Sequence, residues 1–264
     1  MTRAADLPFF DHPVPLPMAH RGGALYEPNV GIENTLTAFA NAVKLGYRYL
    51  ETDVHASRDG VVYAFHDSAL GRLTDRSGRI ADLDSADIRQ ARVHGREPIP
   101  AMAELFEEFP DARFNIDVKE DSAVGPTVEL IEAARAHDRI CLASFSATRI
   151  RRLRCLLGPR VATSLGSAEV ARFRAPLGIV RRRAVTSGAA CLQIPRRVGR
   201  LIVATAGLVA EAHRHGFQVH VWTVNDASQM AELLDIGVDG IITDRIDGLR
   251  DLLIDRGAWD GEPQ

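Results

Sequence analysis

Two acidic residues and two histidines carry the chemistry that is most visible in this sequence. Glu51 and Asp53 lie two positions apart in a short apolar run that we expect to be a strand. Alternate side chains of a strand point to the same side, so both carboxylates face one way. Like charges this close repel each other, and a hard divalent cation such as Mg²⁺ or Ca²⁺ would relieve the repulsion. His20 and His66 add two groups that exchange protons near neutral pH.

Further short motifs accompany these residues in a fixed order along the chain. The first of them are His20-Arg21-Gly22, Glu33-Asn34-Thr35, Glu51-Thr52-Asp53-Val54, Asp59-Gly60, His66-Asp67 and Leu70-Gly71-Arg72-Leu73-Thr74. The last of them are Trp222-Thr223-Val224-Asn225 and the run at residues 237–244. This ordered set resembles the glycerophosphodiester phosphodiesterase family of bacterial type, from His20 to about Asp244. Each triplet alone is weak evidence, whereas the ordered combination is specific.

The resemblance implies a hydrolase that uses a divalent metal ion, Mg²⁺ or Ca²⁺, to convert glycerophosphodiesters to glycerol phosphate and an alcohol. It implies His20 and His66 as the general acid and base, without assigning which is which. It also implies metal ligands at Glu51, Asp53 and Asp117. Asp117 departs from the pattern, because the family more often has Glu there. The shorter side chain leaves room for a shifted ion or a water molecule.

Substrate contacts and supporting residues follow from the same resemblance. Arg21 and Lys119 correspond to phosphate contacts, since Arg can bridge both free oxygens of a phosphodiester and Lys adds a mobile point charge. Trp222 is expected to line the pocket and offer a flat apolar surface to the glycerol or alcohol moiety. Glu33 and Asn34 are expected to hold the metal ligands or His20 in place without contacting the substrate.

Plainer roles remain open for several of these side chains. The three carboxylates can pair with arginines instead of a metal ion, and Arg21 and Lys119 can form salt bridges to them in an empty site. Glu33 can stabilise the N-terminus of the helix that follows, where acidic residues are favoured. Trp222 can be an ordinary aromatic residue of the barrel core.

Two other functions remain compatible with the sequence. The near one is a lysophospholipase D-like phosphodiesterase on the same site, which exposed apolar loops beside the mouth would favour. The distant one is a non-catalytic barrel that binds phosphorylated ligands, which loss of a histidine or a metal carboxylate would favour; none is lost. The attack on phosphorus is open too. The resemblance suggests the substrate's own glycerol hydroxyl, through a cyclic phosphate, and direct attack by water is the other route.

Strand and helix patterns alternate about eight times, the number of units in a closed β/α barrel. The expected strands span residues 16–20, 49–55, 113–119, 140–144, 161–165, 191–194, 217–223 and 240–243. One expected helix begins at Asn34-Thr35, and the others span residues 102–109, 127–137, 147–157, 202–215, 227–234 and 246–256, while residues 169–185 give no clear pattern.

An open, doubly wound sheet would alternate in a similar way, so periodicity alone does not decide the fold. The polar residues named above lie at the ends of many different strands, and such ends meet only at one mouth of a barrel. We therefore expect a single-domain α/β protein, a TIM (β/α)8 barrel over residues 16–256. An N-terminal arm at residues 1–15 precedes it and is expected to lie over the surface, and a C-terminal tail at residues 257–264 follows it.

The composition is that of a globular protein without a strong overall charge. Of 264 residues, 46% are hydrophobic and 25% charged, and the net charge is −3, so no bulk field recruits nucleic acid. The arginine clusters at residues 149–154 and 181–183 are expected to be solvated, with a phosphate-rich or membrane-surface contact as the minority alternative. Cys141, Cys155 and Cys191 are expected to be small buried side chains.

The apolar pattern of the sequence predicts neither a membrane-spanning helix nor a secretory signal. Residues 1–17 lack the apolar core of a secretory signal, and no apolar run approaches the ~20 residues of a membrane helix. We therefore expect a cytoplasmic protein without stable membrane insertion. Its expected partner is a small-molecule glycerophosphodiester, and its oligomeric state stays open.

Overall fold

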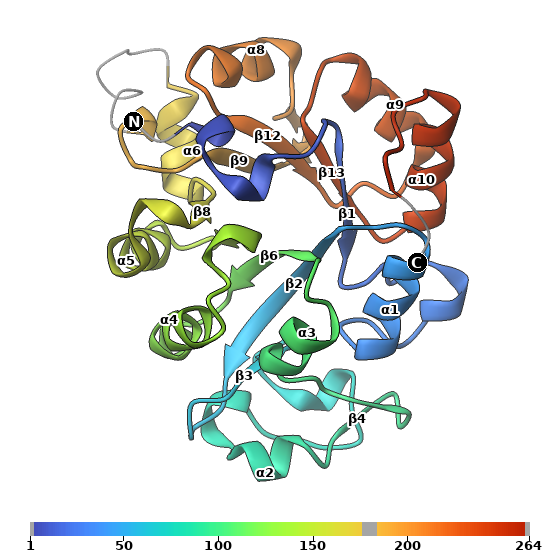
Figure 1. Ribbon diagram of the computed structural model, residues 1–264, viewed down its shortest axis with the longest axis vertical. Helices are drawn as coiled ribbons and strands as arrows, with labels where there is room; N and C mark the ends of the chain where they lie inside the picture. The colour runs from blue at the N-terminus through green and yellow to red at the C-terminus, as the bar shows by residue number, and fades with distance from the viewer. Residues whose placement is uncertain (1–2, 176–183, 262–264) are drawn as a thin grey trace.

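Eight parallel strands close into a barrel in the computed structural model, which describes residues 3–175 and 184–261 (Figure 1). The barrel strands are β1 (Leu16–His20), β2 (Tyr49–Ala56), β6 (Arg113–Val118), β7 (Ile140–Ala143), β8 (Ala162–Thr163), β9 (Cys191–Pro195), β12 (Gln218–Trp222) and β13 (Gly240–Thr243). Hydrogen bonds join them in the order β8-β7-β6-β2-β1-β13-β12-β9. A parallel bridge between Ser164 and Cys191 brings the two ends of that order together, and this closure confirms the TIM barrel over an open doubly wound sheet.

A helix follows each barrel strand and packs on the outside of the barrel (Figure 1). These helices are α1 (Leu36–Lys44), α3 (Met102–Glu108), α4 (Val124–Ala133), α5 (Ala147–Leu157), α6 (Ser167–Phe173), α8 (Ala206–Arg214), α9 (Ala227–Asp235) and α10 (Ile246–Asp255). Side-chain caps explain where several of them begin. Thr35, Ser146, Thr205 and Asp226 each accept a hydrogen bond from the backbone of the first turn that follows.

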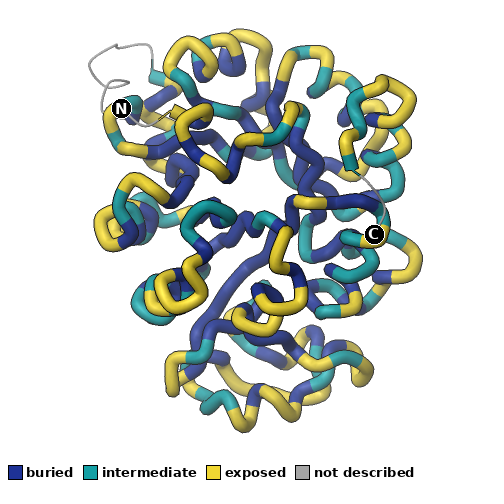
Figure 2. The backbone as a smooth tube through the Cα atoms, viewed as in Figure 1, coloured by how far each residue is buried: buried dark blue, intermediate teal, exposed yellow. Residues whose placement is uncertain are grey.

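The apolar side chains form a shell outside the strands and a plug inside the barrel. Figure 2 shows the central strands buried and the outer faces of the helices exposed. Inside, Phe9 and Phe10 from the N-terminal arm pack with Met18 and Tyr49, and the Tyr49 hydroxyl donates to the Phe9 carbonyl at 2.6 Å. The arm therefore fills one end of the barrel, whereas we expected it to lie over the surface.

An insertion separates β2 from α3 and builds a small core of its own. It contains β3 (Val62–Ala64), α2 (Ser85–Ile88), β4 (Arg92–Val93) and β5 (Glu97–Pro98). Strand β3 pairs antiparallel with β2, and Tyr63, Phe65 and Leu70 lie in the core of the insertion. Strand β2 continues to Ala56, so the chain that leaves β3 returns beside the barrel mouth with His66 at its end.

Several local expectations are wrong. Residues 202–215 are not one helix, because Leu201–Ile202 form strand β11 and the Thr205 cap starts helix α8 at Ala206. The helix expected at residues 127–137 is α4, which begins and ends earlier. Cys155 is exposed on α5, unlike buried Cys141 and Cys191.

The arginine clusters differ from the expectation in part. Arg154 is not solvated, since its guanidinium binds the buried Glu169 carboxylate at 3.0 Å. The cluster at residues 181–183 lies outside the described residues, as does part of the segment at residues 169–185. No helix within residues 3–175 and 184–261 is long and apolar enough to cross a membrane.

Candidate active site

Three neighbouring strands place the polar residues of the barrel mouth in layers. Strand pairing sets His20 level with Glu51, and Glu51 level with Asn115. Asp53 and Asp117 are paired one layer further toward the carboxyl ends of β2 and β6. Since alternate residues of a strand share a face, the carboxylates that are far apart in sequence point into one space.

A tight turn after β1 aims Arg21 into the same space. Arg21 has φ +52°, and Gly22 follows with φ +84°, a conformation that favours glycine. A Cβ atom at Gly22 would lie 2.8 Å from the Ala38 Cβ atom, so a larger residue would push the turn away from α1. Asn29 holds the turn by donating to the Gly22 carbonyl at 2.8 Å.

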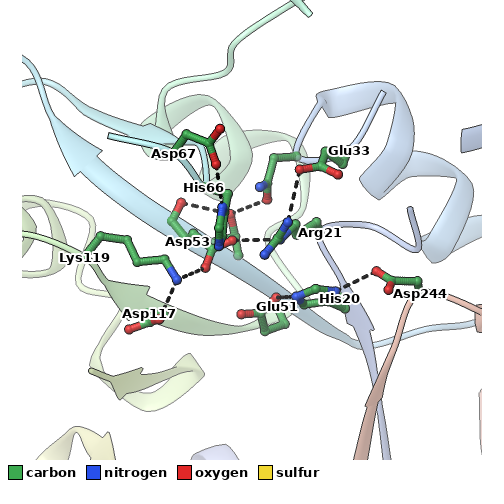
Figure 3. A network of polar contacts seen from close by, with 12 residues as sticks. His20, Arg21, Glu33, Glu51, Asp53, His66, Asp67, Asp117, Lys119 and Asp244 are labelled. Atoms are coloured by element: carbon green, nitrogen blue, oxygen red, sulfur yellow. Dashed lines mark hydrogen bonds and ion pairs between the residues drawn. The ribbon is translucent and has the colours of Figure 1, made fainter. Parts of the chain in front are cut away.

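Two cations and the acidic residues form a compact network at the mouth (Figure 3). The Lys119 Nζ atom lies 2.6 Å from Asp53 Oδ1 and 2.8 Å from Asp117 Oδ2. The Arg21 Nε atom lies 2.9 Å from Asp53 Oδ2, and Arg21 Nη1 lies 3.1 Å from Glu33 Oε1. The expected salt bridges therefore exist, and they hold both cations over the cavity.

Burial and neighbouring charge move the pKa values of these acids in different directions. Burial raises the pKa of Glu51 to about 7, against the opposing effect of His20. Burial opposes ionisation of Asp53 too, but Lys119 and Arg21 outweigh it and hold the pKa of Asp53 below its usual value. Burial raises the pKa of Asp117 despite its contact with Lys119. The charged form of Asp53 is therefore favoured at the mouth, whereas the charged forms of Glu51 and Asp117 are disfavoured by burial.

Each of the two expected catalytic histidines has a carboxylate at its Nδ1 atom. His20 Nδ1 lies 2.6 Å from Asp244 Oδ1, and His66 Nδ1 lies 2.7 Å from Asp67 Oδ1. The remaining Nε2 atoms are thereby left for the cavity that both histidines line. The His20 Nε2 atom lies 3.7 Å from Glu51 Oε2. Although burial lowers the pKa of His20, Glu51 and Asp244 outweigh it and raise that pKa.

Asp244 and the residues around His66 were not predicted as site residues. Strand β13 pairs with β1 so that Thr243 lies opposite Ala19, which sets Asp244 beside His20. On the other side, Arg72 donates to both oxygens of Asp67. The order of the strands in the closed barrel, rather than any local pattern, would have revealed the first contact.

A cavity of about 460 Å³ opens between these polar residues and an apolar wall. Its polar side contains His20, Arg21, Glu51, Asp53, His66, Asp117 and Lys119. Its apolar side contains Phe145, Leu165, Val170, Ile194, Val198, Val203 and Trp222. The Phe145 and Trp222 rings meet edge to face at 5.5 Å, and Lys119 Nζ lies 5.7 Å from the Phe145 ring centre. The expectation that Trp222 faces the pocket agrees with this placement.

The supporting pair Glu33 and Asn34 lies behind the cavity and does not line it. Glu33 binds Arg21, and the Asn34 side-chain oxygen accepts a hydrogen bond from Thr52 at 2.8 Å. The helix cap that follows them is Thr35 and not Glu33. Glu33 therefore orients a cation of the site, and Asn34 fastens the loop to β2.

The three carboxylates fit a divalent cation by their chemistry. In the described part of the chain, no group of three or more His, Cys, Asp and Glu side chains converges closely enough to hold a metal ion. However, Glu51 Oε2 and Asp117 Oδ1 are buried without a hydrogen-bond partner among the described residues, and Asp53 Oδ2 has only the ion pair with Arg21 Nε at 2.9 Å. Three acids face two cations, and two of the acids keep an unsatisfied oxygen, so the set suits a hard cation, which prefers oxygen ligands.

A cavity that offers cations to an anion and histidines to a leaving group suits the hydrolysis of a phosphoric diester, and this is the class of enzyme that fold and site define. The chain belongs to the glycerophosphoryl diester phosphodiesterase family, whose family model matches residues 20–248. It is accordingly a glycerophosphodiester phosphodiesterase, a phosphoric diester hydrolase.

Known proteins resemble this chain over most of its length. A probable glycerophosphodiester phosphodiesterase 2 of Mycobacterium tuberculosis is 43% identical over 98% of both chains. A human lysophospholipase D is 25% identical over 89% of this chain and 85% of that protein. An Oleispira antarctica phosphodiesterase, solved in complex with the product sn-glycerol-3-phosphate, superposes with a TM-score of 0.77 at 23% identity over 91% of this chain and 97% of that one. The last similarity supports the barrel fold.

Proposed function

We propose that this enzyme hydrolyses glycerophosphodiesters to glycerol phosphate and an alcohol with a divalent metal ion and two histidines. The observation that carries the proposal is the pairing of each cavity histidine with a carboxylate at Nδ1, at 2.6 Å and 2.7 Å. Such a carboxylate fixes the orientation and tautomer of an imidazole. Two imidazoles held in this way around one cavity suit the two proton transfers that phosphodiester hydrolysis needs.

Substrate phosphate is expected to bind against Arg21 and Lys119. Both side chains line the cavity, and both are already held by carboxylates, so little side-chain freedom is lost when an anion arrives. Arg21 can bridge two phosphate oxygens, and Lys119 adds a point charge. Together they stabilise the negative charge that grows on the phosphoryl oxygens in the transition state.

Glu51, Asp53 and Asp117 are the residues that would hold Mg²⁺ or Ca²⁺. When bound, the ion would neutralise charge on the phosphate and on the attacking oxygen. The protein itself supplies the proton transfers. One histidine accepts the proton of the attacking hydroxyl, whether this belongs to water or to the glycerol moiety, and the other donates a proton to the departing alcohol oxygen.

A second candidate activity, that of a lysophospholipase D, is favoured by the apolar wall of the cavity. This wall includes Trp222, Ile194 and Val203, and Phe145, which belongs to it, is 57% exposed. A surface of this kind suits an acyl chain better than a small polar head group. One relative, the human protein named above, is a lysophospholipase D.

The test is a release assay over soluble glycerophosphodiesters and acylated lysophospholipids, with and without a chelator. We expect chelation to abolish hydrolysis and Mg²⁺ or Ca²⁺ to restore it. Full activity in a metal-free sample would contradict the proposed requirement for a metal ion.

A variant of the apolar wall separates the two substrate classes. Val170→Lys places a charge on this wall, where Val170 is half-buried. If acylated substrates are physiological, it should raise their KM and leave the KM of a soluble diester nearly unchanged.

A further inference from the structure

A small ribbon of two strands stands beside the barrel after β9. Strands β10 (Arg197–Val198) and β11 (Leu201–Ile202) pair antiparallel with each other. Within residues 3–175 and 184–261 they form a sheet of their own, separate from the barrel sheet. Gly199, with φ +56°, permits the tight turn between them. The base is anchored by backbone hydrogen bonds from Val203 and Ala204 to the Arg196 carbonyl, at 2.9 Å and 3.3 Å.

This ribbon, residues 197–202, exposes large aliphatic side chains on both of its faces. Val198 is 61% exposed, Leu201 55% and Ile202 50%. Val198 lies opposite Leu201 and Arg197 opposite Ile202, so the aliphatic groups are divided between the two faces. Single exposed aliphatic residues are ordinary on a protein surface, but a cluster of this kind marks an interaction site.

The charge of the ribbon is positive, unlike the net charge of −3 of the chain. Arg197 and Arg200 are exposed, and neither has an ion pair with any acid in the described ranges. Arg196, at the base, is bound by Glu232 at 2.5 Å. The exposed part therefore combines aliphatic and cationic groups without a compensating acid, which suits a surface that is both apolar and anionic.

The ribbon also borders the mouth of the catalytic cavity. Val198 lines that cavity from the ribbon, and Val203 lines it from the residue that follows β11. Arg174, exposed after α6, and Phe145 line the same opening. Whatever binds the ribbon therefore lies next to the entrance to the active site.

We propose that the ribbon docks this enzyme on the surface of an anionic lipid bilayer. Leu201 and Ile202 would lie at the boundary between head groups and acyl chains, while Arg197 and Arg200 contact lipid phosphates. The contact is peripheral and needs no membrane-spanning helix. It stands whether or not the enzyme accepts an acylated substrate, and it would hold the cavity mouth against the layer from which such a substrate comes.

A second copy of the chain is a poorer occupant for the ribbon. Two ribbons in a symmetric contact would bring Arg197 and Arg200 of one copy near the same arginines of the other, and like charges in a desolvated contact repel. The ribbon offers no acid of its own to compensate them. An anionic lipid surface satisfies both kinds of side chain at once.

The experiment is co-sedimentation of the full chain with vesicles of phosphatidylcholine containing phosphatidylglycerol, and with vesicles of phosphatidylcholine alone. We expect binding to the anionic vesicles that added salt weakens. Leu201→Ser/Ile202→Ser and Arg197→Gln/Arg200→Gln should each lower the partition coefficient by about tenfold or more. The control for the aliphatic variant is Ile254→Ser, since Ile254 is exposed on α10, which lies across the barrel from α6 (Figure 1). The control for the arginine variant is Arg76→Gln/Arg89→Gln near α2. Both controls should bind vesicles like the native chain.

Hydrolysis of a soluble glycerophosphodiester provides the second readout. The two ribbon variants should retain it, since neither changes a residue of the cavity, and their thermal unfolding midpoints should match that of the native chain. The proposal is overturned if the native chain does not bind anionic vesicles, or if both ribbon variants bind them as well as the controls do. It is also overturned if the native chain forms a dimer that Leu201→Ser/Ile202→Ser converts to a monomer, while the native chain shows no vesicle binding. Inactivity of the native chain toward every diester would refute the proposed function, but the vesicle-binding result would still test the docking proposal.

Discussion

His20 Nδ1 lies 2.6 Å from Asp244 Oδ1, across 224 residues of sequence. The contact joins the first barrel strand to the last one, because β1 and β13 are neighbours in the closed sheet. The other oxygen of Asp244 accepts from Asn225 at 2.9 Å, and the Asp244 backbone amide donates to Asn225 Oδ1 at 2.9 Å. Asp244 is therefore held on two sides and fixes the orientation of the His20 ring.

Replacing Asp244 by Asn should lower kcat with little change in KM. The amide presents a donor to His20 Nδ1 and favours the wrong tautomer, so the Nε2 atom loses its function in proton transfer. We expect kcat to fall by roughly 10² or more, the usual contribution of a positioned acid or base. Asp247→Asn is the control, since Asp247 pairs with exposed Arg245 away from His20. An equal loss in both variants would show that Asp244 only supports the fold.

Lys119 provides a second test through its position between two acids. Lys119→Met removes the charge that lies 2.6 Å from Asp53 and 2.8 Å from Asp117. We expect kcat/KM to fall by roughly 10²–10³, about 3–4 kcal/mol of transition-state stabilisation. Lys44→Met is a matched control, because Lys44 is exposed at the end of α1. Unchanged catalytic efficiency in Lys119→Met would assign Lys119 a structural role alone.

The barrel and the family could be predicted from the sequence because their signals are local. Brief apolar runs marked the strands, and strand parity put Glu51 and Asp53 on one face, as the register with β6 confirms. Family membership is confirmed by the match at residues 20–248. The catalytic, metal-binding and phosphate-binding roles of individual residues stay predictions.

What could not be predicted depends on contacts between distant segments. The Asp244 contact needs the closed strand order, and the burial of Phe9 needs the open end of a barrel to receive it. The ribbon was missed because the apolar pattern of α8 continues backward into Leu201 and Ile202. Two local signals are nevertheless present in the sequence. Gly199 marks the turn of the ribbon, and Thr205 marks the later start of the helix.

Asp67 allows a prediction of how stability depends on pH. Hydrogen bonds from Arg72, with a smaller one from His66 and against some burial, lower the pKa of Asp67 to about 2. Because the folded-state pKa lies below the unfolded value of 3.8, this contribution is complete above about pH 4.5 and is lost as the pH falls toward 2. Arg72 is 54% exposed, so we expect less than about 1 kcal/mol.

The measurement compares thermal unfolding of the native chain and Asp67→Asn at pH 6, 4 and 3. The native chain should be the more stable at pH 6, and the difference should shrink as the pH falls. Asp138→Asn serves as the comparison, since Asp138 forms a similar but more exposed pair with Arg160. A difference that stays constant down to pH 3 would mean that the charge of Asp67 does not cause it.

The last prediction separates the two histidines by the leaving group of the substrate. His20 and His66 come from different elements and face one cavity with Nε2, so one is expected to accept a proton and the other to donate one. For a diester with a poor alcohol leaving group, His20→Ala and His66→Ala should each lose most of the activity, by roughly 10²–10⁴. A nitrophenyl ester needs no donated proton, because its leaving group departs as an anion.

The nitrophenyl substrate should therefore restore the variant that lacks the acid and leave the variant that lacks the base slow. His213→Ala is a matched control, because His213 binds Asp239 outside the cavity, and it should be active toward both substrates. Rates are compared as kcat/KM for each variant on the two substrates. If leaving-group quality affects His20→Ala and His66→Ala equally, the division into acid and base is wrong. One of the two rings would then serve only to position a neighbouring group, such as Glu51, whose Oε2 atom lies 3.7 Å from His20 Nε2.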